Sequence, residues 1–305
     1  MRLHLRGGHC SPKRPTGNVM KLFTVVTVCL NAENDILKTI QSVLDQDFDD
    51  FEYLIKDGGS TDQTLEIARS FSADFEKRGI PYRILSRPDS GVYDAMNQAV
   101  LESQGQWLSF MNAGDCFASS SILSRVYHSG ALENADVVYG DVVYVNHSMY
   151  WYVKPQPISQ MPYGFPFCHQ STFTRVTMLV STPFHTEYRI CGDYHFFMQM
   201  QQQGRRFQYV PFAISKSGPA GISSDRLLNH QEALKMLESM PVREENAIQD
   251  RIKRLNAYKR REFFAGIYRK LTPIWFQEFS RQRRRKKHGW TTADVFFAEH
   301  SDIAP

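Results

Sequence analysis

Thr24-Val-Val-Thr-Val-Cys-Leu30 is the most informative stretch of this 305-residue chain. The run is apolar and β-branched, without the alternation of a half-exposed strand, so it predicts a central strand buried on both faces. The polar segment Asn31-Ala-Glu-Asn-Asp35 follows, and apolar residues then recur at helical spacing from Ile36 to Leu44. This part of the chain therefore predicts a strand, a loop and a helix in succession.

The same rhythm occurs four times up to about residue 130, with further strands predicted at Phe51–Lys56, Tyr82–Ser86 and Gln106–Met111. This alternation predicts an α/β fold with a largely parallel sheet flanked by helices. Right-handed crossovers bring the carboxyl ends of such strands to one edge of the sheet, where open α/β sheets bind ligands. Beyond about residue 135 the pattern changes, with an extended segment at 136–145, a helix expected to start near Cys191 and helical character from 227 to about 271.

Three acidic loops are candidates for chemistry: Asp57-Gly-Gly-Ser-Thr-Asp62, Asn112-Ala-Gly-Asp115 and Cys191-Gly-Asp193. The first combines a carboxylate with glycines that allow close backbone approach, and the second offers oxygen atoms that suit a hard divalent ion. Each loop could instead simply cap the helix that follows it. None has the glycine spacing of a dinucleotide or nucleoside-triphosphate cradle.

Composition excludes several classes of protein. No run approaches the roughly 18 apolar residues of a membrane-spanning helix, and no apolar region follows the basic residues near the N-terminus as in a secretory signal. The five cysteines are scattered without a C-x-x-C pair, which argues against a disulfide framework and a structural zinc site. These features predict a protein of the reducing cytosol, with residues 1–20 as a flexible basic tail.

The charge is unevenly distributed. Residues 251–305 hold 14 Lys and Arg against 5 Asp and Glu, whereas the whole chain has a net charge of only +4. Aromatic and basic residues mix in this segment, at Phe263, Phe264, Ile267, Tyr268, Leu271, Trp275, Phe276 and then 281–287. A basic amphipathic segment with aromatic residues favours an anionic membrane surface. The alternatives are a helix packed on the body followed by a solvated charge run, or a nucleic-acid site, which we do not expect.

Four motifs, in this order, resemble the family 2 glycosyltransferases, and more narrowly the bacterial exopolysaccharide and colanic-acid-type subgroup. They are Thr24-Val-Val-Thr-Val-Cys-Leu-Asn31, Ile55-Lys-Asp-Gly-Gly-Ser-Thr-Asp-Gln-Thr64, Asp89-Ser-Gly-Val-Tyr-Asp-Ala-Met-Asn97 and Phe110-Met-Asn-Ala-Gly-Asp115. The resemblance extends from residue 21 to about 225. It implies a GT-A fold with a Rossmann-like nucleotide-sugar half at about 21–130 and a sugar-acceptor half at about 131–226. The resemblance does not cover 227–305, which the charge and aromatic pattern predict to be a helical, basic, membrane-associating extension.

The resemblance also implies roles for individual residues. Asp193 would be the catalytic base, and Asp115 would hold Mg²⁺ or Mn²⁺ in place of the usual D-x-D motif, which reads Asn112-Ala-Gly114 here. His169 and Gln170 are subgroup landmarks on the side of the sugar acceptor. The expected donor-binding residues are Val28, Leu30, Asn31, Asp57, Gly91, Asn97 and Asn112. The arginine often found before the asparagine of the third motif is Met96 in this chain.

The function implied is an inverting glycosyltransferase that moves a sugar from a UDP- or GDP-sugar to a saccharide acceptor, expected to be lipid-linked, in bacterial surface polysaccharide synthesis. The enzyme would lie peripherally on the inner face of the cell membrane. Two alternatives remain: a non-catalytic module that binds a nucleotide sugar or polysaccharide, and a nucleotidyltransferase. The acidic, glycine-free loop 31–35 speaks against the second, because a triphosphate site usually has a basic glycine-rich loop after the first strand.

Overall fold

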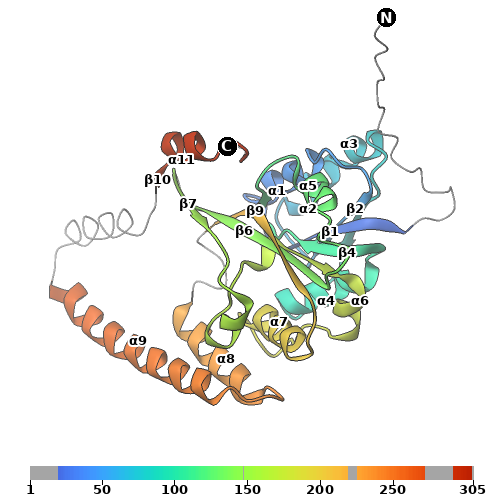
Figure 1. Ribbon diagram of the computed structural model, residues 1–305. Helices are drawn as coiled ribbons and strands as arrows, with labels where there is room; N and C mark the ends of the chain where they lie inside the picture. Colours follow the sequence, from blue (N-terminus) through green and yellow to red (C-terminus); the bar gives the residue numbers. More distant parts are fainter. Residues whose placement is uncertain (1–19, 147, 219–224, 272–290, 304–305) are drawn as a thin grey trace, which may run out of the picture.

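The computed structural model describes residues 20–146, 148–218, 225–271 and 291–303. Ten strands of this part form one sheet, in the order β10-β7-β6-β8-β4-β1-β2-β3, with β9 joined to β6 and β5 joined to β9. Helices cover both faces of the curled sheet, and a helical hairpin extends from one end of the molecule (Figure 1). The predicted α/β class is confirmed.

The first half of the sheet is parallel, as predicted. Its strands are β1 (Lys21–Cys29), β2 (Phe51–Asp57), β3 (Tyr82–Ser86) and β4 (Gly105–Phe110), and β1 lies between β2 and β4. The helices that alternate with them are α1 (Ile36–Leu44), α2 (Thr64–Ser70), α3 (Ser72–Lys77) and α4 (Val92–Glu102). The four strands therefore end at one edge, followed by the loops that the sequence marks as candidates.

The second half is mostly antiparallel. Strand β8 (Thr172–Arg175) pairs with β4 and with β6 (Val137–Asn146), and β6 pairs with β7 (Met149–Val153), in each case antiparallel. Strand β9 (Phe207–Ser217) runs parallel to β6 and carries the short β5 (Cys116–Phe117) on its other edge. The helices of this half are α5 (Ile122–His128), α6 (Val176–Ser181) and α7 (Gly192–Gln202), with 3₁₀ turns at Ile158–Tyr163 and His169–Ser171.

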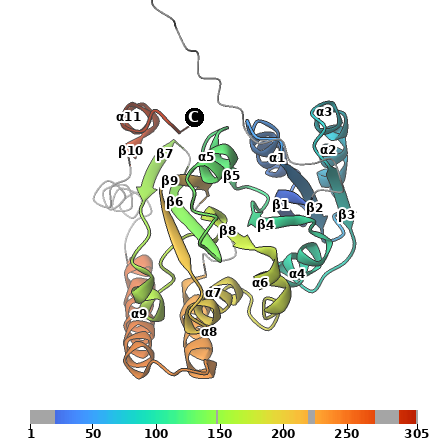
Figure 2. The same ribbon diagram turned by 45° about the vertical axis from the view of Figure 1, so that its right-hand side comes forward.

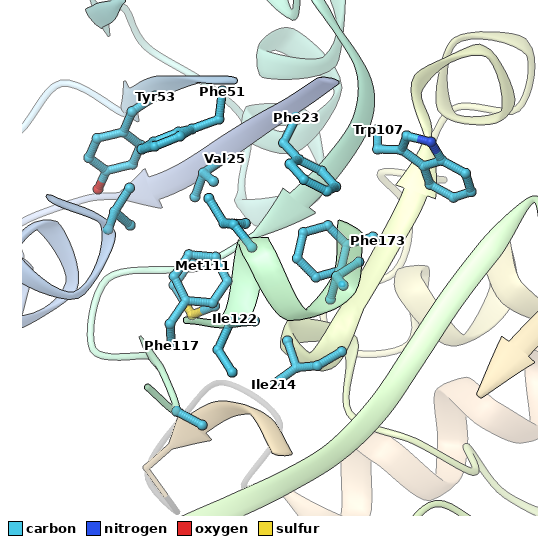
Figure 3. Packing of buried hydrophobic residues seen from close by; sticks show 14 of the residues in the cluster. Phe23, Val25, Phe51, Tyr53, Trp107, Met111, Phe117, Ile122, Phe173 and Ile214 are labelled. Carbon is cyan, nitrogen blue, oxygen red and sulfur yellow. The ribbon is translucent and has the colours of Figure 1, made fainter. Parts of the chain in front are cut away.

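Strand β1 separates two hydrophobic clusters. Phe23 and Val25 belong to the cluster on one face, which Figure 3 shows together with Trp107 and Phe173. Val26 and Val28 point to the opposite face, where they join the side chains of α4 and α7. The continuous apolar run thus occurs because both faces of the strand are buried, and each fully buried side chain of this kind contributes roughly 1.5–3 kcal/mol.

The C-terminal residues contribute to both clusters. Helices α8 (Arg226–Ser239) and α9 (Glu245–Leu271) form the hairpin, confirming the predicted helical extension, and α8 lies beside α7 (Figures 1 and 2). The chain then returns, and β10 (Thr291–Thr292) pairs with β7 ahead of α11 (Ala293–Glu299). Phe296 lies in the first cluster at 1% exposure. The basic segments 1–19 and 272–290, with Trp275, Phe276 and 281–287, lie outside the described residues. No helix in the described ranges has both the length and the apolar character needed to span a membrane.

Replacement of Phe296 by alanine tests whether α11 belongs to the core. We expect Phe296→Ala to lower the free energy of unfolding by about 3–5 kcal/mol, as for other buried aromatic residues. Val295, which is 49% exposed on the same helix, is the control. Val295→Ala should change the stability by less than about 0.5 kcal/mol, the usual range for surface positions. Equal midpoints of urea unfolding for the two variants would contradict this placement of α11.

Candidate functional site

Asp57 ends β2 and is fully buried at the ligand edge. Its carboxylate accepts hydrogen bonds from Ser60 Oγ at 2.5 Å, from Gly59 N at 3.0 Å and from Ser86 Oγ at 2.7 Å. The parallel register supplies the last of these, because Ser86 lies opposite Asp57. Burial raises the pKa of Asp57, but the hydrogen bonds from Ser60, Ser86 and Gly59 outweigh it, so the pKa lies below the ordinary value. Asp57 is therefore an ionised acceptor fixed at the strand end.

Beneath this loop lies Lys56, a residue with no role in the sequence analysis. Its side chain is completely buried, and Nζ donates to the Asp57 carbonyl at 2.8 Å, the Arg87 carbonyl at 2.8 Å and Asp89 Oδ2 at 2.7 Å. A Cβ on Gly58 would lie 2.8 Å from the same Asp89 oxygen, which explains a glycine at that position. Asp89 opens the third motif quoted above. The loops after β2 and β3 are thus held together by one buried ammonium group.

The loop after β1 meets the same turn. Asn31 has a φ of 50°, and its Oδ1 accepts a hydrogen bond from Thr61 N at 2.9 Å while its own N–H donates to Ser60 Oγ at 2.8 Å. Leu30 is 58% exposed beside it, whereas Val28 is buried in the second cluster. Gly91 caps the exposed N-terminus of α4 at a φ of 134°. Leu30, Asn31 and Gly91 therefore line the edge where we expect the nucleotide, and Asp57 is buried at the end of β2 within it.

The turn Asn112–Asp115 follows β4. Thr39 of α1 fixes it, since Thr39 Oγ1 donates to the Asp115 carbonyl at 2.7 Å and accepts from Gly114 N at 3.0 Å. Asn112 Oδ1 is buried and has no hydrogen-bond partner among the residues that the structure describes. The Asp115 carboxylate is 9% exposed and accepts from Ser217 Oγ at 2.6 Å.

These oxygen atoms fit a divalent cation. Burial raises the pKa of Asp115 to about 6, although the hydrogen bond from Ser217 and the charge of Lys38 act in the opposite direction. Together with the unpaired Asn112 oxygen, the Asp115 carboxylate offers the hard donors that Mg²⁺ and Mn²⁺ prefer. Within the described ranges no group of three His, Cys, Asp or Glu side chains gathers to form a metal site. The protein's contribution would accordingly rest on one carboxylate.

Asp193 lies in the first turn of α7. Tyr93 Oη, from α4, lies 3.0 Å from its Oδ1, and His169 Nδ1 lies 3.6 Å from its Oδ2. A Cβ on Gly192 would come within 2.7 Å of the Tyr93 ring, so this close packing requires the glycine. Asp193 and His169 of the expected site are therefore brought together, and Tyr93 joins them.

His169 is buried against the rings of Phe110, Phe184 and Phe197. Burial lowers its pKa below the ordinary value, with the Asp193 carboxylate acting in the opposite direction. The ring is consequently neutral at pH 7. Gln170, the other expected landmark, accepts a hydrogen bond from Cys168 Sγ at 3.1 Å.

Asn97, expected on the donor side, pairs with the backbone of Phe184. Its Nδ2 donates to the Phe184 carbonyl at 2.8 Å, and its Oδ1 accepts from Phe184 N at 2.9 Å. Phe184 packs on His169 and Phe110, so the contacts of Asn97 are with the second half of the molecule. The structure thus gives the Asn97 amide a bracing role between the two halves.

Several contacting residues were missed by reasoning from the sequence: Lys56, Asp89, Tyr93 and Ser217. Asp89 and Tyr93 stand in the third motif, which could have drawn attention to them. A lysine inside a strand predicted to be buried is likewise unusual, and could have marked Lys56. Ser217 gives no such signal. It reaches Asp115 only because β9 pairs with β5, which follows Asp115 directly in the chain.

Solved structures with the same architecture are glycosyltransferases of the GT-A fold. The S. aureus TarS 1–349 structure in complex with UDP-GlcNAc matches with a TM-score of 0.59 at 19% identity, over 77% of this chain and 72% of that one. A longer TarS structure is matched over 42% of its length. The mannosyltransferase PcManGT from Pyrobaculum calidifontis, in complex with GDP-Man and Mn²⁺, matches with a TM-score of 0.58 at 14% identity, over 87% and 85%. These likenesses confirm the fold.

Sequence comparison gives the family. A PGL/p-HBAD biosynthesis glycosyltransferase of Mycobacterium bovis is 33% identical over 177 residues, covering 57% of this chain and 68% of that protein. The model of the family described as glycosyl transferase family 2 matches residues 24–199, which carry the donor edge, Asp115 and Asp193. The chain therefore belongs to glycosyl transferase family 2 and is an enzyme of that family.

Proposed function

We propose that this enzyme transfers a sugar from a UDP- or GDP-sugar to a saccharide acceptor with inversion, using Asp193 as the general base. The observation that carries the proposal is the setting of Asp193, at 18% side-chain exposure, between the Tyr93 hydroxyl and the neutral His169 ring. A partly exposed carboxylate can reach an acceptor hydroxyl, and neutral neighbours leave its negative charge free to take the proton. Family membership favours an enzyme over a binding module or a nucleotidyltransferase.

The reaction is a single displacement. The acceptor oxygen forms a bond to C1 of the sugar while the bond from C1 to the diphosphate oxygen breaks, and the acceptor proton moves to Asp193. Such a positioned base accelerates a reaction by about 10²- to 10⁴-fold. The attack comes from the face opposite the leaving group, so the configuration at C1 inverts and no covalent enzyme intermediate forms.

On the donor side, the edge formed by Leu30, Asn31 and Gly91 would hold the nucleotide, with the buried Asp57 fixing the turn at Gly59 and Ser60. The proposal draws support from the UDP-GlcNAc and GDP-Man named in the TarS and PcManGT structures. Asp115 and Asn112 would bind Mg²⁺ or Mn²⁺. A bound divalent ion supplies positive charge that neutralises the departing diphosphate.

The sugar acceptor would be lipid-linked and reached at the inner membrane surface. Phe263 and Phe264 on α9 are 67% and 65% exposed, and the basic residues Lys259, Arg260 and Arg261 lie shortly before them, separated by Glu262. Exposed aromatic side chains beside basic residues provide the apolar and electrostatic parts of stable attachment to an anionic membrane. Peripheral attachment would bring the enzyme to an acceptor for surface polysaccharide synthesis.

Asp193→Asn tests the base. It keeps the size of the side chain but cannot take a proton, so transfer should fall by at least about 10²-fold. Donor affinity should stay within a few-fold, since the base acts on the acceptor. Nucleoside diphosphate release from UDP- and GDP-sugars with added lipid-linked saccharides, donor binding and melting temperature are measured on one preparation. Transfer at the parent rate, or a loss that tracks unfolding, removes Asp193 from the mechanism.

Asp115→Asn tests the metal site. We expect Mn²⁺-dependent binding of UDP or GDP to weaken by at least about tenfold, a typical loss when a metal site is impaired. Asp35 is a matched control, because its side chain is 54% exposed and lies 3.8 Å from the Cβ position of Gly114. Asp35→Asn should retain the metal dependence. Titration calorimetry with and without Mn²⁺ measures both, and equal behaviour of the two variants would rule out the assignment of Asp115.

Phe263→Ser combined with Phe264→Ser tests membrane attachment. The parent should co-sediment with vesicles containing anionic lipid and be released by added salt, because screening limits surface charge to about 8 Å at physiological ionic strength. The double variant should bind several-fold more weakly. Leu101→Ser, at a residue 73% exposed on α4, should bind as the parent does. Point variants are preferable to a truncation at residue 250, because the truncation would also remove the packed segment 291–303. Unchanged binding of the double variant would contradict the proposal.

A further inference from the structure

Glu232 is a buried carboxylate on α8, outside the residues matched by the family model. It is 8% exposed and accepts three backbone hydrogen bonds from consecutive residues. Arg189 N donates to Oε1 at 2.8 Å, and Ile190 N and Cys191 N donate to Oε2 at 2.8 Å and 3.0 Å. Hydrogen bonds to an ionised group are about twice as strong as neutral ones, so this carboxylate grips the backbone of one short segment.

That segment leads directly into α7. Cys191 is the N-cap of the helix, and Asp193 follows two residues later. On its other side, the Tyr93 hydroxyl lies 2.5 Å from the Ile190 carbonyl and 3.0 Å from Asp193 Oδ1. Residues 189–191 are therefore held between contacts from α4 and α8, directly before the turn that carries Asp193.

We propose that Glu232 is a positioning residue for Asp193, so that the C-terminal helical hairpin completes the catalytic site. This inference rests on the proposed role of Asp193 as the base. Glu232 does not touch the reacting atoms. It fixes the backbone from which α7 starts, and its negative charge lies at the helix N-terminus, where the helix dipole stabilises an anion.

Simple attachment of α8 does not require this carboxylate. Ala233, Met236 and Leu237 are each no more than 1% exposed and pack in the cluster that contains α7. Because burying a charge carries a desolvation cost that apolar contacts avoid, a glutamate is a poor choice for adhesion alone. Two acceptor oxygens that reach three consecutive N–H groups are suited to fixing backbone geometry.

The test compares Glu232→Gln with Glu187→Gln. The first variant loses one acceptor oxygen and places an amide N–H₂ against backbone donors. The second breaks the exposed ion pair between Glu187 and Lys235. This pair also joins α8 to the segment before α7, but it makes no hydrogen bond to the backbone of residues 189–191. We expect Glu232→Gln to lower kcat by about tenfold with the KM for the donor unchanged, since a small misplacement of a catalytic group is costly. Glu187→Gln should keep the parent kcat.

A purely structural role predicts a different pattern. If kcat of Glu232→Gln equals that of the parent, or falls only in proportion to the folded fraction given by the melting curve, the inference is overturned. Glu232→Asp is a second variant in case the first does not fold. It keeps the charge but is one methylene shorter, so a reduced kcat with unchanged donor KM is expected, and a parent kcat overturns the proposal.

Combining Glu232→Gln with Asp193→Asn distinguishes a failure of this inference from a failure of the proposed function. If Glu232 acts through Asp193, adding Glu232→Gln to Asp193→Asn should cause no further loss of transfer. A further tenfold loss would overturn the inference while leaving Asp193 as the base. Parent-level transfer by Asp193→Asn alone would refute the proposed function, and with it the positioning role. An inactive Asp193→Asn with a fully active Glu232→Gln would refute only the positioning role.

Discussion

The buried ammonium group of Lys56 is the constraint on which the donor edge depends. Moving such a charge out of water costs several kcal/mol unless it is paired and fully hydrogen-bonded. Here Nζ has three acceptors, the carbonyls of Asp57 and Arg87 and the Asp89 carboxylate, so the ammonium group joins the loops after β2 and β3. Asp57 is thereby fixed before any ligand arrives, which lowers the ordering cost of binding.

Helix α4 extends this order to the second half of the molecule. Gly91 caps the helix at the donor edge, and two residues later the Tyr93 hydroxyl reaches Ile190 and Asp193. One turn further along, Asn97 pairs with both backbone groups of Phe184. A single rigid element of 11 residues thus connects the expected nucleotide site with the expected base. The antiparallel strands beyond β4 are joined to this arrangement through β8, and they bring Ser217 to Asp115.

The parallel half of the fold and the convergence of its loops could be predicted because their signals are local. Apolar periodicity marks each strand and helix, and the handedness of the crossovers places the strand ends together. Glu232 and Phe296 could not be recognised in the same way, since each acts through partners more than 40 residues away: Glu232 is 41 residues from Cys191, and Phe296 stacks on Tyr150. The strand pattern around Lys56 does not identify its hydrogen-bond partners, and the pairing of Asn97 with the backbone of Phe184, 87 residues away, has no local signal either.

The sequence of the basic C-terminal segment allows two interpretations, a helix packed on the body and a surface for an anionic membrane, and helix α9 is compatible with both. The first turns of α9 pack on the body. Four side chains on one face of the helix are each less than 9% exposed: Ala247, Ile248, Arg251 and Leu255. Two turns further along, Phe263 and Phe264 project into solvent. A helix that is anchored at one end and exposed at the other can hold α8 against the segment before Asp193 while presenting aromatic and basic residues elsewhere. Within the described residues, the part of the basic segment that lies in α9 is thus continuous with a helix that packs on the body.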